Sequence, residues 1–117
     1  MITINVCKLI KDFYECFDSN NIHKLQKLYD LCKEDCILNG ENLKEFIKKR
    51  EDLFKNGIYK NFYEYEIIPL LFKNNVYIST FASYGLKYDQ DYYNAGVKIF
   101  TLEQRNNQYF IKNVNYF

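Results

Sequence analysis

Tryptophan is absent from this 117-residue sequence, and proline and glycine are scarce, with one and four residues. So few chain breakers predict long helices and strands. No apolar run reaches the ~18 residues that a membrane-spanning helix needs. The first residues also lack the basic and apolar regions of a signal peptide. We therefore expect one domain over residues 1–117, without a membrane segment or a secretory signal.

Neither sign of charge is in clear excess, because the sequence has 16 Lys and Arg residues and 15 Asp and Glu residues. A net charge of +1 gives no general field for binding nucleic acid or an anionic membrane, so we expect neither partner. Cys32 and Cys36 form the one close cysteine pair, and the sequence has a single histidine. Tetrahedral zinc needs four ligands, so we expect no metal centre and no cofactor. The cysteines are expected to be reduced thiols.

Hydrophobic periodicity changes along the chain from 3.6 to 2 residues. Helical spacing of apolar residues predicts helices over residues 3–17, 22–29 and 41–54, with a short strand at 36–38. Alternation then predicts four antiparallel strands at residues 61–72, 76–87, 94–102 and 109–117. Pro69 suggests that the first of these is an edge strand or carries a bulge. The order indicates an α+β fold, with three helices covering one face of a curved sheet and a cone-shaped pocket between them.

The order of local motifs resembles the nuclear transport factor 2-like superfamily over nearly the whole chain. An aromatic pair, Phe13-Tyr14, precedes a polar turn and a short helix ending in Leu28-Tyr29. A short strand with Asn39-Gly40 leads into the third helix, and the chain closes on two aromatic-rich strands. The resemblance implies a cone-shaped α+β roll, in a fold that hosts enzymes, binders and adaptors alike.

The resemblance implies no known enzymatic activity of that superfamily. Ketosteroid isomerase-like members need a tyrosine, a carboxylate base and a buried acid at places where this chain has Phe13, Asn39-Gly40 and Lys98. A phenyl ring and an ammonium cannot supply the neutral acidic donors of that oxyanion hole. The arginine-aspartate cluster of the epoxide hydrolase-like members is not evident either. We therefore expect a protein without catalytic residues.

The transport branch of the superfamily fits the sequence better, and the resemblance implies binding of a Ran-like GTPase in its GDP form. Asp89 and Asp91 fall on the two acidic loop positions of that branch, where a partner lysine is received. An apolar cone mouth would hold an aromatic side chain of the partner. The other expected partner-binding residues at that mouth are Leu38, Asn39, Phe54, Tyr88, Asn115 and Tyr116.

The sheet face opposite the helices is expected to carry aromatic side chains, including Tyr77, Phe81 and Phe110. An open aromatic face usually meets a partner, and in this superfamily it forms the dimer. The resemblance therefore implies a homodimer, with nucleoporin phenylalanine repeats at its edge and a location in the cytoplasm, the nucleus and the nuclear pore.

Two alternatives remain open at this point. One is the small partner subunit of an mRNA export receptor, which would form a heterodimer through the same sheet face. The other is a small-molecule binder or a SnoaL-like enzyme that uses the cone. Two buried polar groups converging inside the cone would favour this second alternative.

Overall fold

The fold is described here from a computed structural model that covers residues 4–73 and 75–117, without the side chains of 59, 61–62 and 69–73. Three helical segments open the chain, and two strands at the edge of the sheet follow them. One further helix then precedes the four long strands that close the chain. The elements are α1 (Ile4–Glu15), the 3-10 helix η1 (Ile22–Lys27), α2 (Leu28–Leu31), β1 (Cys32–Leu38), β2 (Glu41–Asn42), α3 (Leu43–Lys55), β3 (Tyr59–Lys73), β4 (Val76–Lys87), β5 (Gln90–Arg105) and β6 (Gln108–Tyr116). None of the described helices has the length and apolar character needed to cross a membrane.

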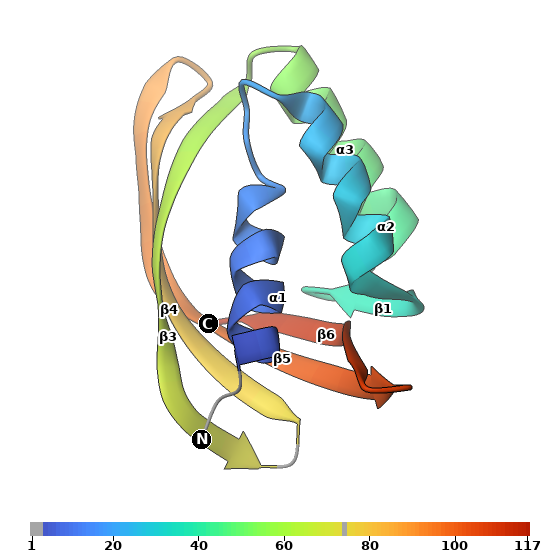
Figure 1. Cartoon of the computed structure of the whole chain (residues 1–117). Helices are drawn as coiled ribbons and strands as arrows, with labels where there is room; N and C mark the ends of the chain where they lie inside the picture. Colours follow the sequence, from blue (N-terminus) through green and yellow to red (C-terminus); the bar gives the residue numbers. More distant parts are fainter. Residues whose placement is uncertain (1–3, 74) are drawn as a thin grey trace.

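The six strands form one sheet in the order β2-β1-β6-β5-β4-β3. Neighbouring strands are antiparallel except β1 and β6, which run parallel. The long strands bend, and α1 lies in their concave side with α2 and α3 beyond it (Figure 1). The predicted α+β architecture of three helices on a curved sheet is therefore confirmed. As predicted from Pro69, β3 is an edge strand, and its register with β4 shifts between Ile67 and Leu71.

The core forms where α1 meets the concave face of the sheet. The α1 stripe that the sequence predicts is buried, and its Phe13 ring meets the Phe100 ring edge-on with 5.1 Å between centroids. Tyr14, the next residue, stacks on Tyr65 of β3 at 4.2 Å. Edge-on and stacked aromatic pairs of this kind contribute about 0.5–1.5 kcal/mol beyond their buried area. These contacts fix which face of β3 and β5 points inward.

The structure differs from the predicted elements at three places. The predicted second helix is divided into η1 and α2, and the short strand β1 is longer than expected and pairs with the unpredicted β2. Strand β5 begins at Gln90 because Tyr88 and Asp89 form a two-residue turn with φ values of 52° and 62°. Two positive φ values are typical of the tight hairpin turn that matches strand twist.

The sequence assigned Tyr77 and Phe81 to the wrong face of the sheet. Both side chains are buried in the core under the helices. The alternate residues of β4, among them Thr80 and Tyr84, are exposed on the open face. Large rings such as these fill the space between a bent sheet and its helices. Tyr77 and Phe81 are therefore not available as a dimer surface.

Phe110 lies where the sequence predicted, on the open face. Its neighbours Tyr109 and Ile111 belong to the core side of β6, and its register partner is the part-exposed Glu103 of β5. The exposed large apolar residues near the β4–β5 end of this face are Tyr84, Leu86 and Tyr93.

Gly96 on β5 is required by a close backbone approach. An added Cβ at Gly96 would overlap the carbonyl oxygen of Phe117, and that carbonyl accepts a hydrogen bond of 2.8 Å from the Val97 amide. We expect Gly96→Ala to destabilise the fold by roughly 1–3 kcal/mol, in the range of overpacked sites. Chemical denaturation measures this, with the exposed Ala95→Ser as the matched control. Equal unfolding midpoints for the two variants would contradict the predicted clash.

A candidate binding site inside the cone

A cavity of about 240 Å³ opens between the concave face of the sheet and α3. Helix α3 contributes Arg50 and Leu53, and the β1–β2 turn contributes Asn39. The four long strands supply the rest of the wall: Tyr63, Phe81, Ser83, Lys87, Tyr92, Asn94, Lys98 and Tyr116. The inward faces of strands that are distant in the sequence thus meet at one small, aromatic-lined space, the usual character of a small-molecule site.

Lys98 is the side chain that sets the chemistry of this cavity. It is 1% exposed, although its side chain ends in an amine. Rings from four elements surround Nζ at centroid distances of 3.4 Å for Phe81, 4.6 Å for Tyr116, 4.8 Å for Tyr63 and 5.0 Å for Tyr14. Among the described residues, no hydrogen-bond acceptor lies within reach of Nζ. The amine is therefore held by aromatic faces alone.

Aromatic faces do not replace the water that a buried ammonium loses. Each cation–π contact contributes about 0.5–2 kcal/mol, whereas desolvating a charged group costs several kcal/mol even after the protein relaxes. Burial, together with the nearby positive charge of Arg50, lowers the pKa of Lys98 from its ordinary 10.5 to about 7. Near neutral pH the cavity thus contains a mixture of ammonium and neutral amine.

The cavity wall carries three basic side chains. Lys98 shares it with Arg50 and Lys87, and the described lining residues include no aspartate or glutamate. The Arg50 guanidinium lies over the rings of Phe17 and Phe46, 5.2 Å from each centroid. These basic side chains make the cavity attractive to an anion.

A neutral hydrogen-bonded pair lies beside Lys98. Tyr14 and Ser79 share a buried hydrogen bond of 2.8 Å, and Ser79 is the register partner of Lys98 across β4 and β5. Burial raises the pKa of the Tyr14 phenol, so the phenol stays neutral. The two hydroxyl groups therefore satisfy each other, and neither accepts a hydrogen bond from Nζ of Lys98.

The structure brings together only two of the residues predicted for the cone mouth. Asn39 and Tyr116 line the cavity. Leu38 and Phe54 are buried in the core instead.

The other four predicted mouth residues lie away from the cavity wall. Tyr88 is 65% exposed at the β4–β5 turn, and Asp89, Asp91 and Asn115 are exposed and do not line the cavity. The two acidic residues and the apolar opening therefore do not form one joint site.

Sequence reasoning had used Lys98 only to exclude an isomerase mechanism. A signal for its burial was nevertheless present, because Lys98 stands two residues before Phe100. Residues two apart in a strand share a face, so a strand that buries Phe100 also turns Lys98 inward. Arg50, for which the sequence analysis assigned no role, lines the same cavity from α3.

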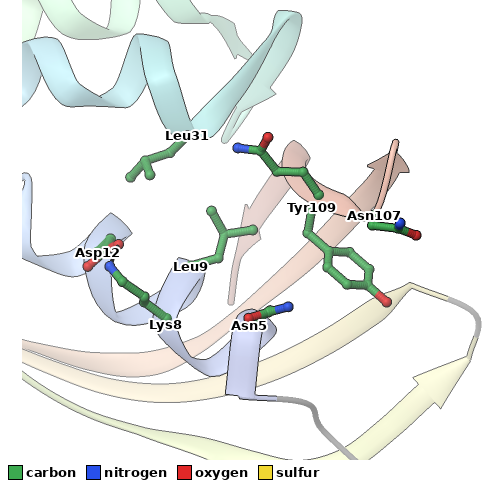
Figure 2. A pocket seen from close by; sticks show the side chains of 8 residues that line it. Asn5, Lys8, Leu9, Asp12, Leu31, Asn107 and Tyr109 are labelled. Atoms are coloured by element: carbon green, nitrogen blue, oxygen red, sulfur yellow. Dashed lines mark hydrogen bonds and ion pairs between the residues drawn. The ribbon is translucent and has the colours of Figure 1, made fainter.

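A second hollow, of about 310 Å³, lies over α1 and is lined in part by Asn5, Leu9 and Tyr109 (Figure 2). Its charged residues Lys8 and Asp12 form an ion pair of 2.7 Å with each other. The opposite charges there neutralise one another, whereas the described residues that line the cone include basic side chains and no aspartate or glutamate. The cone is therefore the stronger candidate site.

No protein-family model and no curated protein matches the sequence, whereas several solved structures match the fold of the chain. A scytalone dehydratase-like protein from Novosphingobium aromaticivorans superposes with a TM-score of 0.73 at 13% identity, covering 96% of this chain and 80% of that one. An NTF2-like protein of unknown function from an Exiguobacterium species gives 0.71 at 14% identity, covering 92% and 95%. The chain has the nuclear transport factor 2-like fold.

LinA also has this fold, with a TM-score of 0.73 at 11% identity, covering 97% of this chain and 82% of LinA. LinA type 2, another solved structure with this fold, is a hexachlorocyclohexane dehydrochlorinase. Identities this low establish only the nuclear transport factor 2-like fold. An activity has to be inferred from the side chains that this chain places in the cone.

Removing the Lys98 amine should stabilise the protein. We expect Lys98→Met to raise the free energy of unfolding at pH 6 by roughly 2–4 kcal/mol, since each pKa unit of depression corresponds to about 1.4 kcal/mol. Between pH 7 and 10 the unfolded parent chain binds the extra proton, so parent stability should rise with pH. The variant should lack this rise. Urea titrations across this pH range, with the exposed Lys112→Met as control, measure both effects. A parent and a Lys98→Met variant with the same pH slope would contradict the assignment.

Proposed function

We propose that this protein binds a small organic anion, with a planar or aromatic body, inside the cone. The observation that supports this most strongly is Lys98, an amine that is 1% exposed and without a hydrogen-bond acceptor among the described residues. A bound carboxylate would accept hydrogen bonds from this amine and offset the cost of burying its charge. The cost in stability without a ligand is typical of residues retained for function.

The cavity wall also supports an apolar body for this anion. Tyr63, Phe81, Tyr92 and Tyr116 present rings on several sides, and Arg50 and Lys87 add positive charge. A volume of about 240 Å³ is below the ordinary range for drug-sized ligands, so the ligand is small. An aromatic or short branched carboxylate has this combination of size, shape and charge.

Carriage of a Ran-like GTPase, with nucleoporin binding, stays a prediction with less support from the geometry. Asp89 and Asp91 are exposed and do not line the cavity, whose own charges are positive. The expected absence of catalysis and the expected nuclear location likewise stay predictions. The homodimer is also a proposal, and exposed Tyr84, Leu86 and Tyr93 would replace Tyr77 and Phe81 in it.

Benzoate and benzamide separate charge from shape in the test of this proposal. We expect benzoate to bind at least about tenfold more tightly than the neutral, similarly shaped benzamide, since a charged hydrogen bond contributes about 1.5–3 kcal/mol. Lys98→Met should remove this preference, whereas Lys112→Met should retain it. Titration calorimetry at pH 6.5 measures the affinities. Equal binding of the two compounds, or of benzoate by the parent and Lys98→Met, would refute the proposal.

The benzoate affinity measured in the same titration should decrease as the pH rises above 7. The charged or titratable groups facing Lys98 are Arg50 on α3, Tyr14 on α1, Tyr63 on β3 and Tyr116 on β6. Above the Lys98 pKa of about 7, binding must take up a proton, so benzoate affinity should fall by at most about tenfold per pH unit. Lys98→Arg keeps the charge and should flatten this dependence.

A further inference from the structure

We propose that Lys98 is a nucleophile, and that the cone captures an oxo acid by forming an imine between Nζ and the ligand's aldehyde or ketone carbon. This inference rests on the proposed anion site and specifies its ligand class. The carboxylate of such a ligand would lie toward Arg50 and Lys87, and its carbonyl carbon toward Lys98, because all three residues line one cavity.

The position of the amine is what makes the reaction feasible. Lys98 lines a cavity that is rich in aromatic rings, and among the described residues its Nζ has no hydrogen-bond partner that would occupy its lone pair or hold its protons. No aspartate or glutamate among the described lining residues competes as an ion-pair partner. A lysine held by a carboxylate would remain charged and inert, whereas Lys98 has only aromatic faces and other cations around it.

The protonation state agrees with this geometry. A lysine becomes a nucleophile when desolvation and a neighbouring cation favour its neutral form. Burial and Arg50 both act in this direction on Lys98 and bring its pKa to about 7. At pH 7 its neutral form is then about a thousandfold more populated than that of an exposed lysine with an ordinary pKa.

The step balances without any further reactant. The Nζ lone pair attacks the carbonyl carbon, and a C–N bond replaces the carbonyl π bond. The carbonyl oxygen then leaves as water and takes with it the two hydrogens that Nζ carried as a neutral amine. The product is a C=N imine and one water molecule, and hydrolysis reverses it. The small, ring-lined cavity limits access of bulk water to this bond.

Reductive trapping tests the inference on the intact chain. The probe is 4-formylbenzoate with sodium cyanoborohydride at pH 7, followed by peptide mass mapping. We expect the reduced adduct at Lys98 to form at least about tenfold faster than at any exposed lysine, given its larger neutral fraction. The neutral benzaldehyde should label Lys98 more slowly than 4-formylbenzoate, because it lacks the carboxylate that Arg50 and Lys87 attract.

Binding of 4-methylbenzoate, which has the carboxylate but no carbonyl, separates this inference from the anion site itself. If 4-methylbenzoate binds and 4-formylbenzoate gives no preferred adduct at Lys98, the inference is overturned and the anion site stands. If 4-methylbenzoate does not bind, the anion site is overturned as well. Lys98→Arg removes the amine and should give no adduct at residue 98. The mapped position in the parent chain decides the question even if this variant does not fold.

Discussion

The site depends on the period-two alternation of β5, which turns Phe100 and Lys98 toward the same side of the sheet. Phe100 is fixed inward because its ring packs edge-on against Phe13 of α1. Shifting the strand by one residue to release Lys98 would expose Phe100 and every other core residue of β5. The aromatic core therefore forces an amine into the cone, and the rings around it come from the same packing.

Much of the fold follows from local patterns, because helical stripes and tight turns are encoded over a few residues. The α1 stripe, the α3 helix and the four long strands were predicted in this way. The assignment of faces on β4 failed because both faces carry apolar residues. Ser79 made the inner face look polar, yet its hydroxyl pairs with Tyr14 across the core. A hydrogen bond between distant segments cannot be recognised from alternation alone.

The predicted site failed for a related reason. Asp91 and Tyr92 are adjacent in sequence, but neighbouring residues of a strand point to opposite faces. Tyr92 lines the cavity and Asp91 is exposed, so the acidic positions and the opening separate on folding. Arg50 and Lys98 show the converse, since they are distant in sequence and yet line the same cavity. That convergence depends on the packing of α3 against β1 and β3, and it has no local signature.

Charge and reactivity in this cavity are two consequences of one desolvated amine. If Lys98 had a carboxylate partner, it would be a stable ion pair, and if it were solvated, it would be an ordinary surface cation. Aromatic walls give it neither partner nor water, so its two protonation states have similar free energy near neutral pH. An anion shifts that balance toward the ammonium, and a carbonyl consumes the neutral amine. A ligand that carries both groups can use the fixed cations for its carboxylate and leave Lys98 neutral for its carbonyl, which is why an oxo acid fits this site better than a simple carboxylate.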